Sequence, residues 1–182
     1  MKNNIVLIGF MGVGKGRTAR SIAAKTNMYA VDCDDLIESI ANMKIKTIFE
    51  VHGEEYFRRL EQKTAKWLED SVSSTIISSG GGFFKVKNLQ KIGKIIYLHA
   101  DFETILAGLM ADVNAEKKLR KRPLLQDRDK ARSLFAERVP LYRQAADVEI
   151  PVAGLSADQV AQEIISTLEG GKKKKNSRKT KM

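Results

Sequence analysis

A glycine-rich segment near the N-terminus has the residue types and the spacing of a phosphate-binding loop. It has the form G-x-x-x-x-G-K and reads Gly9-Phe10-Met11-Gly12-Val13-Gly14-Lys15-Gly16-Arg17-Thr18. Glycines let backbone N–H groups approach phosphate oxygens, a following helix N-terminus attracts the same anion, and Lys15 reaches the β- and γ-phosphates. A turn that serves packing alone is the disfavoured alternative. We therefore expect a nucleotide to contact Gly12, Val13, Gly14, Lys15, Gly16, Arg17 and Thr18.

Acidic residues follow the second apolar run of the chain, in Asp32-Cys33-Asp34-Asp35. In an extended chain Asp32 and Asp34 point the same way, and two carboxylates near a triphosphate can take two roles. One helps to hold Mg²⁺ through water, and the other accepts a hydrogen bond or a proton from a hydroxyl that is to be phosphorylated. Helix N-capping is the alternative use, and we expect it of Asp35.

Further polar residues stand after the third apolar run and within helical stretches. Residues 78–82 read Ser-Ser-Gly-Gly-Gly, and three consecutive glycines indicate close approach of the backbone to a ligand. Arg58 and Glu61 are three residues apart and lie on one face of a helix. Taken singly, Arg58, Arg122 and Arg138 could equally be surface charges. A proline two residues after Arg138 is expected to interrupt the helix there.

Short apolar runs alternate with helix-compatible sequence along the chain. The expected strands cover residues 5–8, 29–31, 75–77, 94–98 and 148–150. This alternation is typical of βαβ units and predicts an α/β fold, a three-layer α/β/α arrangement around a five-stranded parallel sheet. Because ligand-binding loops gather at the carboxyl ends of parallel strands, the phosphate-binding loop, the aspartates and the glycine triplet should meet at one edge.

The composition fits one domain followed by a basic segment. The chain has 182 residues and a formal net charge of +10, and seven Lys and Arg residues without any acid follow Glu169. Residues 1–169 are expected to form the domain, with +3 of this charge, and residues 170–182 a disordered tail. The single cysteine, Cys33, excludes an internal disulfide. Without a secretory signal or a run of about eighteen apolar residues, we expect a cytoplasmic protein.

Six segments together resemble the shikimate kinases, small P-loop kinases of the nucleoside-monophosphate-kinase type. They follow the order of the family's motifs along nearly the whole chain. The segments are Gly9-Phe10-Met11-Gly12-Val13-Gly14-Lys15, Asp32-x-Asp34, Phe57-Arg58-x-x-Glu61, Gly80-Gly81-Gly82, Arg122-Pro123-Leu124-Leu125 and Arg138-x-Pro140-Leu141-Tyr142. Each is weak alone, whereas six in register are specific. The implied architecture is the P-loop kinase fold with a mobile lid at about residues 111–125.

The resemblance implies an activity and a role for each motif. The implied reaction transfers a phosphoryl group from ATP, with Mg²⁺, to the 3-hydroxyl of shikimate, a step toward chorismate and the aromatic amino acids. Asp34 would orient the attacking hydroxyl, while Lys15 and Arg122 would stabilise charge on the transferring group and bind the nucleotide. Asp32 would hold Mg²⁺ through water, and a monomer is implied. Shikimate would be bound by Asp34, Arg58, Gly80, Gly81, Gly82 and Arg138.

Three positions, Gly16, Arg17 and Gly108, depart from the pattern of the family; at residue 17 the long cation stands where the family is expected to have a small hydroxyl side chain. Gly16 replaces the usual serine, so the direct hydroxyl ligand of Mg²⁺ is missing and the ion depends on phosphates, water and Asp32. Gly108 stands where the family places an arginine against the adenine ring. Adenine contacts would then fall to the loop after Ile150 and to the lid residues Lys117, Lys118 or Arg120.

Two other functions fit parts of the sequence. One is another small-metabolite or nucleotide kinase on the same fold, although the glycine triplet and the two substrate arginines in this order argue against a gluconate-type kinase. The other is a catalytically weak nucleotide-binding protein whose basic tail binds nucleic acid, which Gly16 and the tail favour. ATP and shikimate are the expected small-molecule partners, and neither a membrane nor a specific nucleic acid is expected.

Overall fold

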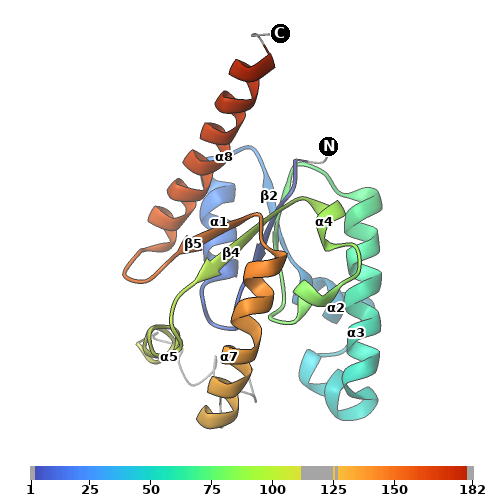
Figure 1. Ribbon diagram of the computed structural model, residues 1–182. Helices are drawn as coiled ribbons and strands as arrows, with labels where there is room; N and C mark the ends of the chain where they lie inside the picture. Colours follow the sequence, from blue (N-terminus) through green and yellow to red (C-terminus); the bar gives the residue numbers. More distant parts are fainter. Residues whose placement is uncertain (1–2, 112–124, 126, 180–182) are drawn as a thin grey trace.

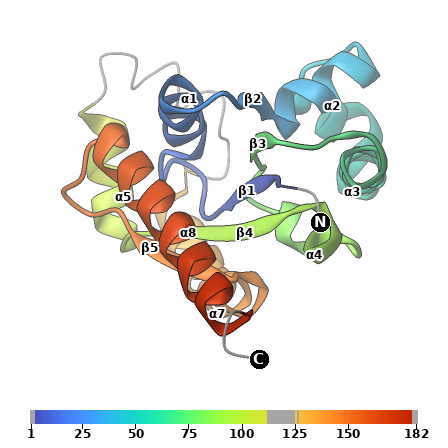
Figure 2. The same ribbon diagram turned by 90° about the horizontal axis from the view of Figure 1, so that it is seen from above.

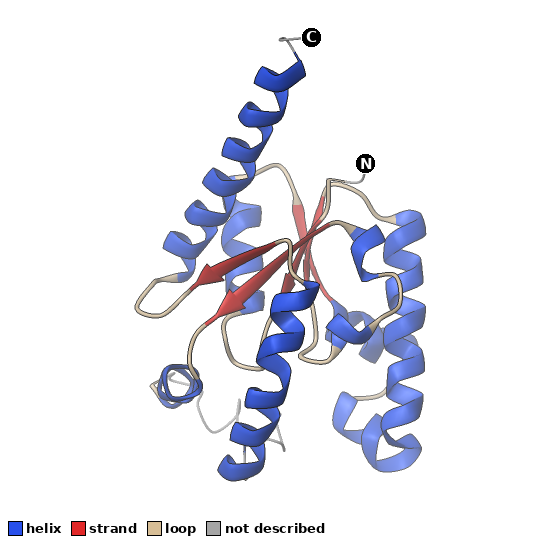
Figure 3. Ribbon diagram, viewed as in Figure 1, coloured by secondary structure: helices blue, strands red, loops and turns tan. Residues whose placement is uncertain are grey.

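A parallel sheet forms the centre of the computed structural model, which describes residues 3–111, 125 and 127–179, with residues 171–179 described by backbone alone. The sheet has five strands in the order β2-β3-β1-β4-β5, and every pair is parallel. The strands are β1 (Ile5–Ile8), β2 (Tyr29–Asp32), β3 (Thr75–Ser78), β4 (Lys94–His99) and β5 (Val148–Pro151) (Figure 3). The α/β fold with a five-stranded parallel sheet is therefore confirmed.

Helices connect the strands and cover both faces of the sheet. They are α1 (Lys15–Lys25), α2 (Cys33–Ala41), α3 (Ile45–Ser71), the 3₁₀ turn η1 (Phe83–Lys85), α4 (Leu89–Ile92), α5 (Phe102–Met110), α7 (Arg128–Ala145) and α8 (Ala157–Lys179) (Figure 1). Helix α3 is kinked at Gly53, where φ is 77°. Helix α7 continues through Pro140, so the expected interruption is wrong. Arg138 and Tyr142, which flank the proline, are buried and both donate to the Gly81 carbonyl, so tertiary contacts hold the helix on both sides of the proline.

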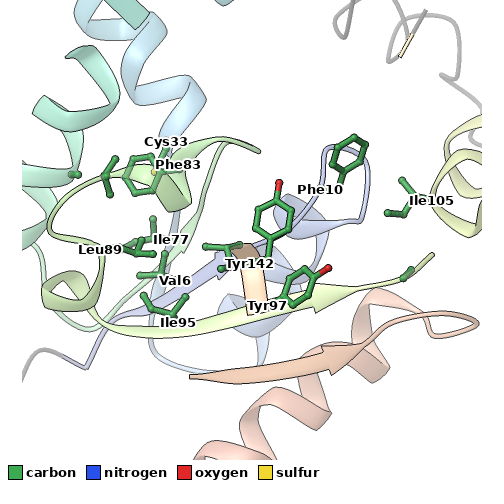
Figure 4. Packing of buried hydrophobic residues seen from close by; sticks show 14 of the residues in the cluster. Val6, Phe10, Cys33, Ile77, Phe83, Leu89, Ile95, Tyr97, Ile105 and Tyr142 are labelled. Carbon is green, nitrogen blue, oxygen red and sulfur yellow. The ribbon is translucent and has the colours of Figure 1, made fainter. Parts of the chain in front are cut away.

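The two faces of the sheet are buried by different helices because successive strand residues point to opposite sides. Ile5 and Leu7 of β1 pack with the apolar faces of α1 and α8. Val6 and Ile8 pack on the other side with residues of α3, α4, α5 and α7, where Tyr97 and Tyr142 are the largest buried side chains (Figure 4). A smaller apolar cluster joins α2 to α3, and both helices lie at the β2 end of the sheet (Figure 2).

The basic C-terminal segment overlaps the last part of α8. The bounds of this helix run to Lys179, whereas the sequence predicts disorder from residue 170. The division into a domain of residues 1–169 and a disordered tail stays a prediction. Within the part of the chain that the structure describes, no helix combines the length and the apolar character needed to cross a membrane.

Asn4 ties together the edge of the sheet opposite the phosphate-binding loop. Its side chain is 1% exposed. The amide Nδ2 donates to the carbonyl oxygens of Val72 and Ile92, both at 2.9 Å, and Oδ1 accepts from the Thr75 N–H at 3.1 Å. One side chain thus satisfies three backbone groups at the end of α3, the end of α4 and the start of β3.

Replacing Asn4 by Ala should lower the free energy of unfolding by about 2 to 4 kcal/mol, because three buried backbone groups lose their partner. Urea denaturation measures this difference. The matched control is Asn3→Ala at the exposed neighbouring position, which should change it by less than about 0.5 kcal/mol. Equal stability of the two variants would contradict the role given to Asn4.

Candidate active site

The phosphate-binding loop joins β1 to α1 in a conformation that requires glycine. Gly12 and Gly14 have φ values of 91° and 106°, in the left-handed region that side chains disfavour. A Cβ atom at Gly12 would also lie 2.5 Å from Cδ1 of Leu109 on α5. Gly14 is the N-cap of α1, so the loop ends at a helix N-terminus, as anion binding requires.

Lys15 lies inside the loop and is only 8% exposed. Its ammonium group donates to the carbonyl oxygens of Gly9 at 2.7 Å and Phe10 at 3.0 Å. Thr18 is buried one turn later, whereas Arg17 is exposed. The loop therefore holds its lysine in place before any phosphate is added.

The aspartates lie at the junction of β2 and α2, and they differ in role. Asp32 is the N-cap of α2, because its Oδ1 accepts from the Asp34 N–H at 2.9 Å. Its Oδ2 accepts from the Ser78 hydroxyl at 2.8 Å. The expectation that Asp35 caps the helix is wrong: α2 begins at Cys33, directly after β2, so Asp35 already lies in the first turn.

Asp34 is held in a buried, acidic environment. Burial, together with the negative charge of Asp32, raises the pKa of this carboxyl to about 7, and the positive charge of Lys15 opposes the rise. Its Oδ1 lies 2.7 Å from the position that a Cβ atom would take at Gly80. A side chain at residue 80 would therefore displace the carboxylate from its position. At neutral pH Asp34 is thus poised between its protonated and ionised forms.

Arg58 is oriented by two carboxylates on α3. Its guanidinium donates to Glu61 at 2.5 Å and to Glu54 at 2.7 and 3.0 Å. The predicted pair of Arg58 and Glu61 on one helix face is confirmed. Glu61 is only 2% exposed; burial raises its pKa, and Arg58 counteracts this. A Cβ atom at Gly82 would overlap the guanidinium of Arg58, so the third glycine of the triplet admits the arginine.

Arg138 reaches the middle glycine of the same triplet from α7. It is 6% exposed, and its Nη1 donates to the Gly81 carbonyl at 3.1 Å. The hydroxyl of Tyr142 donates to the same carbonyl at 2.6 Å. Burial raises the pKa of Tyr142 to about 12, so this hydroxyl keeps its proton. Its ring stacks on Tyr97 at 5.2 Å between centroids, in the core seen in Figure 4.

The structure brings most of the expected residues to one edge of the sheet. Lys15, Asp34, Arg58 and Arg138 meet around the glycine triplet, while Arg122 and the lid cations Lys117, Lys118 and Arg120 lie outside the described residues. Gly108 is exposed on α5.

The sequence assigned no role to three groups that hold site residues in place. They are Glu54, which accepts from Arg58, the Tyr142 hydroxyl, which donates to Gly81, and Ser78, which donates to Asp32. Ser78 ends a parallel strand, and that position is a signal that could have identified it.

Comparison with known proteins places this site in a family. The family model described as Shikimate kinase matches residues 11–169. The chain belongs to the shikimate kinase family. A shikimate kinase of Caldanaerobacter subterraneus is 39% identical over 89% of this chain and 94% of its own length. That of Helicobacter hepaticus is 36% identical, over 91% and 96%.

Solved structures agree with the family. A shikimate kinase from Acinetobacter baumannii in complex with shikimate superposes with a TM-score of 0.83 at 31% identity, covering 94% of this chain and 96% of that one. The shikimate kinase of Aquifex aeolicus gives a TM-score of 0.74 at 31% identity, with 92% and 97% covered. The matched chains span nearly their full lengths, so the similarity extends over the whole domain rather than over the phosphate-binding loop alone.

Replacing Tyr142 by Phe should raise the KM for shikimate about three- to tenfold, because the Gly81 carbonyl loses one of two donors and the triplet loses its fixed orientation. The KM for ATP should stay within about twofold, since the phosphate-binding loop is not contacted. Steady-state kinetics with each substrate varied in turn measures both constants.

Tyr97→Phe is the matched control, because the Tyr97 hydroxyl pairs with Nδ1 of His99 at 2.8 Å instead of with the triplet. A shikimate KM that is unchanged in Tyr142→Phe, or raised equally in the control, would argue against a positioning role for Tyr142.

Proposed function

We propose that this chain transfers the γ-phosphoryl group of ATP to the 3-hydroxyl of shikimate, using the residues gathered around the glycine triplet. The observation that carries the proposal is the approach of two guanidinium groups and the buried carboxylate of Asp34 to the same three glycines, next to Lys15. The second buried carboxylate there, that of Glu61, is paired with Arg58. A carboxylated substrate with a reactive hydroxyl needs that combination: cations for its carboxylate and a carboxylate for its hydroxyl.

Arg58 and Arg138 bind the carboxylate of shikimate. Planar guanidinium groups bind a carboxylate with paired, charge-assisted hydrogen bonds. Glu54 and Glu61 hold Arg58 in orientation, and the buried Nε of Arg138 has no hydrogen-bond partner among the described residues. The positive charge of Arg138 and of Arg58 also acts on Glu61, which supports their closeness.

Asp34 orients the attacking hydroxyl and accepts its hydrogen bond or its proton. The reaction adds the hydroxyl oxygen to the γ-phosphorus and breaks the bond to the ADP oxygen, and the hydroxyl proton must leave. A carboxylate with a pKa near the working pH is suited to accept it. Burial of Asp34 and the neighbouring Asp32 supply that pKa.

Lys15 and the phosphate-binding loop stabilise the charge on the phosphates. The backbone N–H groups of Gly12, Gly14, Gly16 and Arg17 bind the phosphates, whereas those of Val13 and Thr18 donate to the carbonyl oxygens of Phe10 at 3.3 Å and Gly14 at 2.9 Å. Lys15 moves from the loop carbonyls to the transferring group. Arg122 adds a second cation from the lid. Catalysis then rests on positioning and electrostatics, without a covalent intermediate on the protein.

The oxygen atoms of Asp32 and Ser78 near Gly16 fit a magnesium site. Oδ2 of Asp32 and Oγ of Ser78 each lie 3.7 Å from the position that a Cβ atom would take at Gly16, and oxygen atoms are the ligands that Mg²⁺ prefers. When bound, Mg²⁺ would neutralise charge on the nucleotide phosphates. Asp32 would hold it through water. We further infer a monomer that acts in the cytoplasm.

Release of ADP with and without shikimate tests the proposed function. Shikimate should stimulate ADP release strongly, and the rate should depend on Mg²⁺. Absence of stimulation, with nucleotide binding intact, would contradict the proposal and favour a nucleotide-binding protein without kinase activity.

The pH dependence of kcat/KM for shikimate tests the role of Asp34. The ionised form accepts from the hydroxyl, so activity should fall as pH drops below about 7, with a slope of about one in log kcat/KM. Asp34→Asn removes the carboxylate and should lower kcat about 10²- to 10⁴-fold. A wild-type profile that stays flat from pH 8 to about pH 5 would argue against Asp34 as the proton acceptor.

A further inference from the structure

Ser78 and Asp32 form a fixed polar pair at the carboxyl ends of neighbouring strands. In the parallel register of β2 with β3, Asp32 lies opposite Ser78, so both side chains point to the same face of the sheet. Ser78 is 3% exposed, and its hydroxyl donates to Oδ2 of Asp32 at 2.8 Å. Because Oδ1 of Asp32 caps α2 at the same time, the carboxylate cannot turn freely.

This pair faces Gly16 of the phosphate-binding loop, where the hydroxyl of the family's usual serine is missing. A Cβ atom at Gly16 would lie 3.7 Å from Oγ of Ser78 and 3.7 Å from Oδ2 of Asp32. The third nearby atom is Nη1 of Arg20, at 3.6 Å, which belongs to an exposed side chain that can turn toward solvent. Two oxygen atoms therefore line the space that a hydroxyl at residue 16 would enter.

The direction of the hydrogen bond leaves the Ser78 oxygen available. Its proton is given to Asp32, so the lone pairs of Oγ remain free to face a cation. Asp32 is assigned to the cation through water, and Ser78 offers a second oxygen beside it. Mg²⁺ demands nearly octahedral oxygen coordination, and a neutral hydroxyl is a suitable ligand.

We propose that the Ser78 hydroxyl, oriented by Asp32, supplies to the divalent cation of the metal–nucleotide complex the oxygen ligand that Gly16 does not provide. The inference rests on the proposed function, because it requires a nucleotide on the phosphate-binding loop. In this chain the protein ligand of the cation thus comes from the end of strand β3 instead of from residue 16 of the phosphate-binding loop.

A double-mutant cycle between residues 16 and 78 tests this inference. The probe is Mn²⁺, titrated into each variant saturated with ADP and followed by electron paramagnetic resonance; the affinity for ADP without metal is measured by calorimetry. The variants are Ser78→Ala, Gly16→Ser and the double variant. A Cβ atom at residue 16 meets its neighbours only in ordinary van der Waals contact, so Gly16→Ser is expected to fold.

Ser78→Ala should weaken Mn²⁺ binding about fivefold in the Gly16 protein and less than about twofold in the Gly16→Ser protein, because the restored hydroxyl takes over the ligand position. Gly16→Ser alone should bind Mn²⁺ more tightly than the natural sequence. The ADP affinity without metal should be equal in the natural sequence and in Ser78→Ala. Ser79→Ala is the matched control, since its hydroxyl donates to the Leu7 carbonyl, which the Ser79 N–H also contacts.

The inference is overturned if Ser78→Ala weakens Mn²⁺ binding equally in both backgrounds, or in neither. A loss of metal-free ADP affinity in Ser78→Ala would also overturn it. Shikimate-stimulated ADP release in the natural sequence separates this result from a failure of the proposed function. If that release is present and the cycle shows no coupling, only the role of Ser78 is wrong. If ADP does not bind at all, the proposed function fails together with the inference.

Discussion

Parallel pairing of β3 with both β1 and β2 is the constraint on which the site depends. This pairing places the carboxyl ends of three strands together at one edge of the sheet, and each strand continues into a segment with a different chemical role. β1 leads to the phosphate-binding loop, β2 to the paired aspartates and β3 to the glycine triplet. Because the apolar clusters on both faces fix the pairing, the core positions the reacting groups, and Tyr142 of this core also contacts Gly81 directly.

Close approach explains the glycine triplet better than backbone conformation does. Among the described residues, the glycines with φ in the left-handed region do not include residues 80 to 82. Instead, the Asp34 carboxylate and the Arg58 guanidinium occupy the space of the missing side chains at Gly80 and Gly82. The triplet therefore lets charged groups of the protein gather in a small volume, where a substrate carboxylate and hydroxyl can meet them.

The two buried carboxylates near the glycine triplet, Glu61 and Asp34, differ in their charged neighbours and therefore in their pKa values. Glu61 is buried and holds Arg58, which in turn keeps the Glu61 pKa from rising further. Burial and the negative charge of Asp32 raise the pKa of Asp34 to about 7, and the positive charge of Lys15 only partly opposes this rise. One carboxylate of the site thus stays with its arginine while the other can exchange a proton near neutral pH.

The sequence by itself determined the parallel α/β fold with its strands, and it predicted the residues that the structure gathers around the glycine triplet, because apolar periodicity and motif spacing are local properties of the chain. It also determined the absence of a hydroxyl at Gly16. Only the tertiary structure decided that Asp32, rather than Asp35, caps α2, that α7 continues through Pro140 and that the Tyr142 hydroxyl holds Gly81. It alone brought Ser78 opposite Asp32 and Gly16, since register and packing join residues that are far apart in sequence.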